Sequence, residues 1–443
     1  MAKKRIKKIQ DYDRAYSLLH RYVAFAIKHS YRSILHVGKE NIPTDGAIIF
    51  APNHTNALMD ALVMLNIDLK PKVFVARADI FRNRKLAKAL TFLKMMPIMR
   101  QRDGFNAVKK NQEIIDRSVD VLKDRMPFCI FPEGTHLAKY SSLPLSKGIF
   151  RIAMQALEQM PEMPLYIVPV GLRYGNLFCF RSTVRLQIGQ PINVGEFMAE
   201  NSHLSAQEQI NAMKELLAER MKEVIFHIPN DDDYNAIYEI CNAAEPVEVG
   251  ELLKKKENRK KHRLELQFQA NNVTLRRIAE LKENAPDKAK KLIELGKEAS
   301  VSRMSKGIDA ESVAADCTAF SRALKFVLLL AALPYTLALS VLTAPTALMC
   351  KLIFTKLKDP AFRNSVRFLV YLFVWPLVLL IYTIILFCVL PWQWALPAVL
   401  LVLPAPMVAH DMKNVAMRAM SDIRLMKEKR LKKIYAGIKE LIM

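Results

Sequence analysis

A histidine and an aspartate at the end of an expected strand are the residues whose types and spacing best suit chemistry. His54 follows the apolar run 48–52, and Asp60 lies six positions further along the chain. A histidine at a strand-to-helix junction can act as a base, and a nearby carboxylate can orient its ring. The alternative is that the pair Asn53-His54 only caps the start of a helix.

The spacing of this pair constrains the local backbone. Five residues separate His54 from Asp60. On a regular helix with 3.6 residues per turn, that spacing does not put the two side chains on one face. The pair can therefore meet only if the segment between them starts irregularly.

A second chemical segment is the sequence Phe131-Pro-Glu-Gly-Thr-His136, which ends the expected strand 128–131. Its proline and glycine predict a tight turn, which would offer backbone N–H groups and the carboxylate of Glu133 at the end of the strand. We interpret this turn as a site-forming loop.

Three cationic side chains lie near these segments in the sequence. Arg100 and Arg102 follow an apolar stretch, and arginine is the side chain best suited to bidentate contact with phosphate. Lys147 precedes Gly148 and an apolar helix, so it could hold an anion near a helix N-terminus or could be a solvated surface charge.

Four ordered blocks resemble those of the glycerolipid acyltransferase superfamily, which includes glycerol-3-phosphate and lysophosphatidate acyltransferases. They are Asn53-His54 with Asp60, Pro97-Ile98-Met99-Arg100, Phe131-Pro132-Glu133-Gly134-Thr135 and Val168-Pro169-Val170-Gly171. The resemblance covers roughly residues 38–194 and implies an α/β fold, a mixed sheet flanked by helices, with the His–Asp pair at the mouth of an acyl groove. The family usually has four residues between His and Asp, whereas this chain has five, a spacing that some glycerol-phosphate acyltransferases share.

The resemblance also implies roles for the blocks. His54 and Asp60 would be the catalytic residues. The residues expected to bind the acceptor and its phosphate are Arg100, Arg102, Glu133, Gly134, Thr135 and Lys147. The block expected near the acyl chain is Pro169, Val170 and Gly171.

Transfer of an acyl group from a thioester to an alcohol needs a base, and we expect His54 to take the hydroxyl proton while Asp60 holds the ring tautomer. The chain has no G-x-S-x-G motif and the blocks contain no cysteine, so direct transfer is expected without an acyl-enzyme. The expected donor is acyl-CoA or acyl carrier protein, and the expected acceptor is glycerol 3-phosphate or its 1-acyl derivative. No metal or organic cofactor is implied.

Three alternatives remain open. Two are related enzymes, a dihydroxyacetone-phosphate acyltransferase and a transacylase that uses a phospholipid donor. The third is a catalytically dead membrane scaffold. Nucleic-acid binding is disfavoured, because the basic runs adjoin apolar segments and lack the interleaved aromatic residues of a stacking platform.

Composition favours a chain that acts at membrane lipids. The 443 residues are 51% hydrophobic, which fits a membrane-attached enzyme, and their net charge of +23 predicts attraction to an anionic partner, either nucleic acid or acidic headgroups. Six scattered cysteines without C-x-x-C spacing predict neither a disulfide framework nor a zinc site, and indicate a reducing compartment.

The elements that must position the site read as an α/β domain over residues 38–230. The expected strands are 47–51, 73–76, 128–131, 165–170 and 184–188, and helical stretches separate the first four. A capping box at Ser205 and Glu208 predicts a helix that runs to about Ile228.

Residues 1–37 form a basic N-terminal region that does not read as a secretory signal. Within it, residues 16–34 alternate apolar and basic side chains, the pattern of an amphipathic helix. Such a helix could lie in a bilayer interface or pack on the protein's own core.

The rest of the chain divides into a charged helical connector at 231–320, a membrane region at 321–412 and a basic C-terminal helix at 413–443. The uncharged runs 368–390 and 391–409 predict a hairpin of transmembrane helices with its turn at Pro391-Trp392-Gln393-Trp394. The run 326–349 either crosses the bilayer or re-enters it.

Basic residues in the loop 351–367 and in the tail after Ala409 predict that both are cytoplasmic. We expect the catalytic domain there too, since thioester donors are made in the cytoplasm. An even number of crossings must then separate that domain from the loop, so we predict that 326–349 dips in and returns, bending at Pro334 or Pro345.

Overall fold

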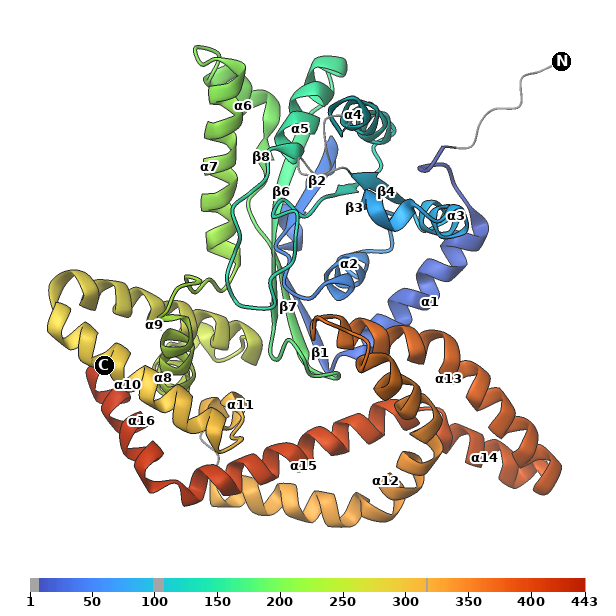
Figure 1. The fold of residues 1–443 in the computed structure, drawn as a ribbon, viewed down its shortest axis with the longest axis vertical. Helices are drawn as coiled ribbons and strands as arrows, with labels where there is room; N and C mark the ends of the chain where they lie inside the picture. Colours follow the sequence, from blue (N-terminus) through green and yellow to red (C-terminus); the bar gives the residue numbers. More distant parts are fainter. Residues whose placement is uncertain (1–7, 99–106, 316–317, 443) are drawn as a thin grey trace. The chain divides into compact units, whose positions relative to one another are not determined.

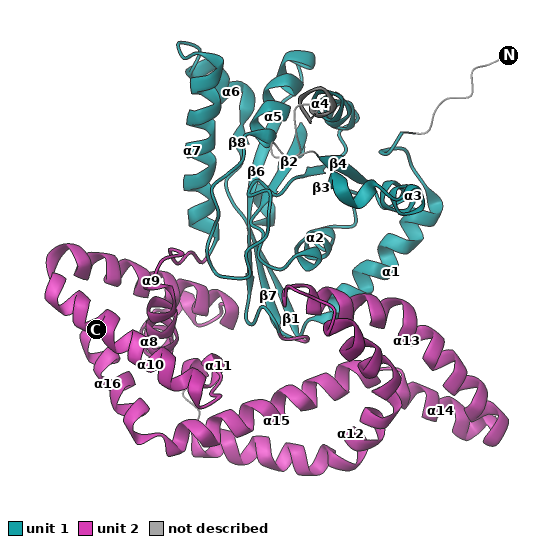
Figure 2. Ribbon diagram, in the orientation of Figure 1, with its two compact units in different colours: residues 1–178, 182–225 teal, residues 179–181, 226–443 magenta. Residues whose placement is uncertain are grey.

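The computed structural model describes residues 8–98, 107–315 and 318–442. The chain divides into two compact units, which Figure 2 shows in different colours. Unit 1 comprises residues 1–178 and 182–225, and unit 2 comprises residues 179–181 and 226–443. Each unit is considered by itself below.

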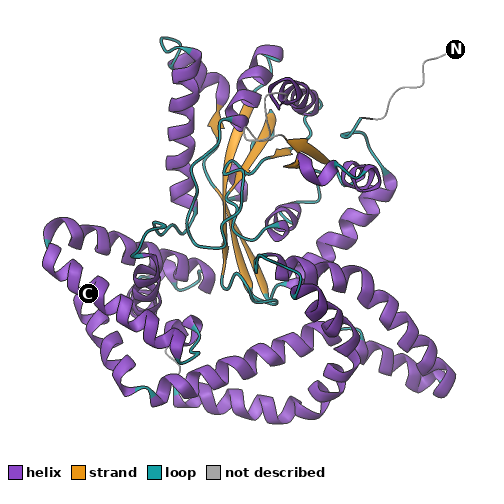
Figure 3. Cartoon of the chain, in the orientation of Figure 1, coloured by secondary structure: helices purple, strands orange, loops and turns teal. Residues whose placement is uncertain are grey.

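Unit 1 is built on a mixed sheet in which eight strands are described (Figures 1 and 3). The order is β1-β7-β6-β2-β5-β3-β4, with β8 paired to β6. Pairs of β6 with β7 and β8 are antiparallel, and the other pairs are parallel. The strands are β1 Ser33–Val37, β2 Ala47–Pro52, β3 Val73–Arg77, β4 Met95–Ile98, β5 Phe128–Cys129, β6 Leu165–Tyr174, β7 Thr183–Ile188 and β8 Ile192–Asn193. The predicted mixed α/β sheet is confirmed.

Three of these strands, β1, β4 and β8, were not expected from the sequence, whereas all five expected strands are present. Strands β1 and β4 lie at the two edges of the sheet. All five residues of β1 are half-buried, as suits an edge strand. Its sequence, Ser33-Ile-Leu-His-Val37, is not the continuous apolar run that predicts a central strand.

The helices of unit 1 are α1 Arg14–Ser30, α2 Leu58–Leu65, α3 Arg84–Phe92, α4 Ala107–Lys123, α5 Gly148–Gln159, α6 Val194–Glu200 and α7 Ala206–Val224, with one-turn helices η1 Lys39–Asn41 and η2 Ala78–Phe81. A core on one face of the sheet combines Ile49 and Ala51 of β2 with apolar residues of α4, α5 and α7. The predicted capping box of Ser205 and Glu208 is present, although α7 ends at Val224, before the expected Ile228.

The predicted boundary at residue 38 is wrong. Residues of α1 such as Tyr16, Val23 and Ile27 are buried in unit 1, and β1 pairs in parallel with β7. The N-terminal segment therefore completes the sheet domain, because one side of α1 is buried and β1 pairs with a strand far along the chain. At the other end, unit 1 closes at Ile225 where 230 was expected.

Unit 2 is helical. Its helices are α8 Tyr234–Lys254, α9 Arg263–Asn284, α10 Pro286–Ser305, α11 Ala310–Ala315, α12 Ala319–Phe354, α13 Phe362–Val389, α14 Trp392–Val402, α15 Ala405–Lys427 and α16 Lys429–Ile442, with the one-turn helix η4 Lys256–Asn258. The predicted separation of a connector from a C-terminal helix is not observed. Glu239 of α8 is fully buried and accepts bonds from Arg303 of α10 at 2.7 Å and from Tyr435 of α16 at 2.6 Å.

This packing has a topological consequence. Helix α16 lies after the apolar helices in the sequence, whereas α8 and α10 lie before them. Because these three helices share one buried polar cluster, they lie on the same side of any membrane that the helices between them cross. An even number of membrane crossings is therefore expected between α11 and α16.

Helices α12 and α13 are long and apolar enough to cross a membrane, and α14 continues into α15 through a bend of 48°. The predicted turn near Pro391 lies between α13 and α14. Helix α12 continues through both Pro334 and Pro345, so no break in the helix marks a point of return, and the predicted dip of 326–349 stays a prediction. Helix α12 packs against α13 and α15.

Candidate active site

The histidine–aspartate pair lies at the carboxyl end of β2. His54 Nδ1 is 2.7 Å from Asp60 Oδ2. The pair meets because the segment between β2 and α2 is not helical: Ala57 has φ 47° and ψ −126°, and α2 begins only at Leu58. The irregular start that the sequence spacing required is confirmed.

Asp60 holds this turn in place as well as the imidazole. Its side chain is completely buried, and Oδ2 also accepts the backbone N–H groups of Thr55 at 2.9 Å and Asn56 at 2.7 Å. Its other oxygen, Oδ1, accepts the hydroxyl of Tyr174 at 2.6 Å. Burial raises the pKa of Tyr174 well above its ordinary value, so the phenol stays protonated and donates a hydrogen bond to the carboxylate.

Asn53 ties the same turn to β6. Its side chain exchanges two hydrogen bonds with the backbone of Leu172, at 3.1 and 2.6 Å, and its N–H bonds to the carbonyl of Val170 at 3.2 Å. The Asn53-His54 pair therefore anchors a strand end, and the helix-cap alternative does not describe it.

The block Pro169-Val170-Gly171 is part of buried strand β6. Pro169 and Val170 pair in register with Ala51 and Pro52 of β2. A Cβ on Gly171 would come within 2.0 Å of the Val224 carbonyl oxygen, so only glycine fits where α7 ends against the strand. The block therefore pairs with the end of the strand that carries His54. Its proximity to an acyl chain stays a prediction.

The loop after β5 brings Glu133 beside the pair. Glu133 is 6% exposed, and its Oε1 accepts the backbone N–H of His54 at 3.3 Å. Burial, helped by the charge of Asp60, raises the pKa of Glu133 to about 8, against the opposing effect of the N–H groups of His54 and Leu143. Much of this carboxyl is therefore protonated at neutral pH.

Two rings of the same loop surround the imidazole. Phe131 stacks on His54 with ring centroids 4.2 Å apart, and His136 meets it edge-on at 5.5 Å. His136 is the last residue of the motif 131–136, but the sequence alone gave no reason to expect its ring beside His54. Tyr174 was missed because it lies 114 residues from Asp60 in the sequence.

The remaining acceptor-binding candidates lie around the same edge of the sheet. Gly134, with φ 66°, and Thr135 are exposed at the loop tip. Lys147 is the residue before α5, and Ser146 bonds to the carbonyl of Pro132 at 2.7 Å, which joins this helix start to the loop.

Arg100 and Arg102 lie outside the described residues. The preceding strand β4 runs parallel to β3, which is parallel to β5, and β5 is parallel to β2. The chain therefore leaves β4 at Ile98 on the edge of the sheet where His54 and Glu133 lie.

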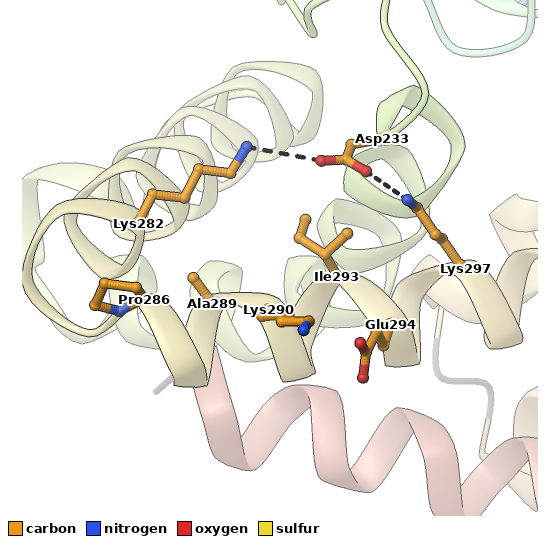
Figure 4. A pocket seen from close by; sticks show the side chains of 8 residues that line it. All are labelled: Asp233, Lys282, Pro286, Ala289, Lys290, Ile293, Glu294 and Lys297. Carbon is orange, nitrogen blue, oxygen red and sulfur yellow. Dashed lines mark ion pairs between the residues drawn. The ribbon is translucent and has the colours of Figure 1, made fainter.

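Unit 2 holds a cavity of about 360 Å³ that carries no comparable chemistry (Figure 4). It lies beside α10, and its Asp233 carboxylate is 2.7 Å from Lys297 and 4.0 Å from Lys282. Without a histidine or a nucleophile among its lining residues, this cavity is not a candidate for acyl transfer. Among the described residues, no cluster of three or more His, Cys, Asp or Glu could hold a metal ion.

Comparison with known proteins identifies relatives of unit 1. The model of a family described as Acyltransferase matches residues 33–173. The 1-acyl-sn-glycerol-3-phosphate acyltransferase of Bacillus subtilis is 27% identical over 42% of this chain and 85% of its own length. Glycerol-3-phosphate O-acyltransferase 2 of Saccharomyces cerevisiae is 27% identical over 35% of this chain, but that match spans only 21% of the yeast protein. The crystal structure of the 1-acyl-sn-glycerophosphate acyltransferase from Thermotoga maritima is 19% identical, covering 48% of this chain and 81% of that one, at a TM-score of 0.35.

Proposed function

Because this chain belongs to the glycerolipid acyltransferase superfamily, we propose that it moves a fatty acyl group from a thioester to a hydroxyl of glycerol 3-phosphate or of its 1-acyl derivative. The observation that carries the proposal is the His54–Asp60 pair, fixed at the end of β2 beside the Glu133 loop. The names of the bacterial and yeast relatives support a glycerol-phosphate acceptor.

In this reaction His54 is the general base. With Nδ1 bonded to Asp60, the lone pair of the neutral ring is on Nε2, which takes the proton of the acceptor hydroxyl. The freed oxygen attacks the thioester carbonyl carbon, the carbon–sulfur bond breaks, and the thiolate leaves with the proton that His54 returns. The products are an ester and a free thiol.

Asp60 stabilises the imidazolium that forms during the transfer, and its buried bonds fix the ring for each turnover. Tyr174 acts through Asp60, because its hydroxyl reaches the carboxylate and not the imidazole. Glu133 accepts the backbone N–H of His54. The base is therefore fixed both by the end of β2, which precedes it, and by the loop after β5.

The acceptor's glycerol phosphate would lie over the exposed tip of the Glu133 loop. Gly134 and Thr135 offer backbone and hydroxyl groups there, and Lys147 adds a positive charge at the start of α5. Arg100 and Arg102 follow β4 at the same sheet edge and supply guanidinium groups for the phosphate. The donor is acyl-CoA or acyl carrier protein. A thioester is higher in free energy than the ester that forms, so the transfer needs no metal or organic cofactor to drive it.

Attachment to a membrane fits the length and apolar character of α12 and α13. We place unit 1 on the cytoplasmic face, where acyl thioesters are made. The basic tail supports the same side, since cytoplasmic segments are rich in Lys and Arg.

An acyl-transfer assay on the purified full chain tests the proposal. Acyl-CoA, acyl carrier protein thioesters and a phospholipid would each be offered as donor with glycerol 3-phosphate, its 1-acyl derivative or dihydroxyacetone phosphate, and His54→Ala is the matched control. Transfer to either glycerol-phosphate acceptor supports the proposal. Preference for dihydroxyacetone phosphate, transfer only from a phospholipid donor, or no transfer from any donor would each favour one of the alternative functions.

A further inference from the structure

Tyr31, the residue directly after α1, is a buried phenol that the proposed reaction does not use. It is 5% exposed, and the centroid of its ring lies 6.0 Å from that of the Tyr174 ring. Tyr174 in turn donates a hydrogen bond to Asp60. Because a buried hydroxyl without a hydrogen-bond partner is destabilising, we expect Tyr31 to bond within this cluster.

The pairing of the sheet brings Tyr31 to this position. The next residue, Arg32, donates its backbone N–H to the carbonyl of Ser182 at 2.8 Å, where β1 begins to pair with β7. Val184 of β7 pairs with β1 on one side and with Tyr174 of β6 on the other. The start of β1 and the end of β6 are therefore fixed relative to each other by backbone hydrogen bonds through β7.

The direction of the hydrogen bonds follows from the protonation of the two phenols. Burial raises the pKa of Tyr31 and of Tyr174 well above the ordinary value, and the charge of Asp60 raises both further, so both stay protonated. A hydrogen bond between the two hydroxyl groups also acts on both pKa values. Tyr174 uses its single hydroxyl hydrogen in the bond to Asp60 Oδ1 at 2.6 Å, so its oxygen can only accept from Tyr31.

We propose that Tyr31 is a positioning residue, which donates a hydrogen bond to Tyr174 and thereby strengthens the bond from Tyr174 to Asp60. A donor to a phenol oxygen polarises the phenol, which makes its own hydrogen a better donor. Asp60 then holds His54 and the turn after β2 more firmly, and Tyr31 itself touches no substrate. The inference rests on the proposed acyl transfer for its effect on rate, whereas its effect on the turn needs no substrate.

Hydrogen exchange in the purified full chain tests this chain of bonds without a substrate. The backbone N–H groups of Thr55 and Asn56 donate to Asp60 Oδ2, so exchange in the peptide 53–60 reports how firmly the carboxylate is held. Tyr31→Phe should raise the exchange rate of this peptide by about 2- to 10-fold, the effect expected for the loss of one neutral hydrogen bond. The other peptides of unit 1 should exchange as in the wild type.

Two further variants separate this role from a general loss of stability. In a Tyr174→Phe background, Tyr31→Phe should have no further effect on exchange in 53–60, because Tyr31 acts only through the Tyr174 hydroxyl. Tyr16→Phe is the matched control: it removes the hydroxyl of another buried tyrosine of α1 and should leave this peptide unchanged. In the acyl-transfer assay, Tyr31→Phe should lower kcat about 2- to 10-fold while the KM values for donor and acceptor stay unchanged.

Other outcomes overturn the proposal. Wild-type exchange of 53–60 in the Tyr31→Phe protein would do so, as would equal acceleration with and without the Tyr174 hydroxyl. Acceleration that extends over all of unit 1, or that Tyr16→Phe reproduces, would mean that Tyr31 only stabilises the fold. An active enzyme whose kcat does not respond to Tyr31→Phe would exclude a role in the reaction. If the wild-type chain transfers no acyl group but exchange changes as expected, the proposed function fails and the positioning of Asp60 by Tyr31 is still supported.

Discussion

Replacement of Tyr174 by phenylalanine should slow catalysis from a position that no substrate reaches. The change removes the hydroxyl that bonds to Asp60 Oδ1 at 2.6 Å and keeps the ring. Tyr174 is 1% exposed and Asp60 is 0% exposed, so water cannot replace the lost bond. The carboxylate would keep its bonds to His54 and to the turn but would be less well fixed and less well solvated.

The size of the effect follows from the kind of bond. A hydrogen bond to a charged group contributes about 1.5–3 kcal/mol, and each 1.4 kcal/mol in the transition state is about tenfold in rate. The lost bond would destabilise the pair of the Asp60 carboxylate and the His54 imidazolium that forms in the transition state. If the whole free energy of the bond is lost there, kcat should fall about 10- to 100-fold. The KM values for donor and acceptor should stay unchanged, because Tyr174 is too deeply buried to touch either substrate.

Steady-state kinetics of the purified variant would measure this split between kcat and KM. Tyr166→Phe is the matched control: it also removes a tyrosine–carboxylate bond, to Asp45 at 3.1 Å, but an exposed one away from His54. A merely structural role for Tyr174 would lower the melting temperature and the active fraction without a change in kcat per folded molecule. Folded Tyr174→Phe protein with a kcat within about twofold of wild type would refute the reasoning, given the minimum loss expected for such a bond.

Three further predictions test other parts of the structure. His54→Ala should reduce turnover about 10²- to 10⁴-fold while melting and vesicle flotation stay unchanged, and near-normal transfer by the folded variant would exclude His54 as the base. Because the pKa of Glu133 is raised from 4.5 to about 8, the folded state keeps a proton that the unfolded chain loses, and stability should fall as pH rises between these values. Glu133→Gln should lack that part of the fall in melting temperature, and identical pH slopes for both proteins would contradict the assignment. Cysteines at Lys306 and Lys429 should label from the same side of oriented vesicles, and one at Lys356 from the opposite side if α12 spans; opposite sides for Lys306 and Lys429 would rule out the even number of crossings.

Much of the active-site edge could be predicted from the sequence because its signals are local. A short apolar run predicts a strand wherever it lies, and strands β2 and β5 end directly before His54 and the Glu133 loop. The spacing of His54 and Asp60 even predicted that the turn between them is irregular, since a regular helix would keep the pair apart. The prolines of α12 gave the opposite lesson: they suggested a point where the helix breaks, but the helix continues through both of them.

By itself, the sequence determined which residues could do the chemistry and the order of the elements that carry them. Only the tertiary structure decided what surrounds those residues. Tyr174 reaches Asp60 because β6 lies beside β2, and α1 belongs to the sheet domain because β1 pairs with β7. The reason is that periodicity and turn residues report the local backbone, whereas a hydrogen bond between residues far apart in the chain exists only after the strands have paired.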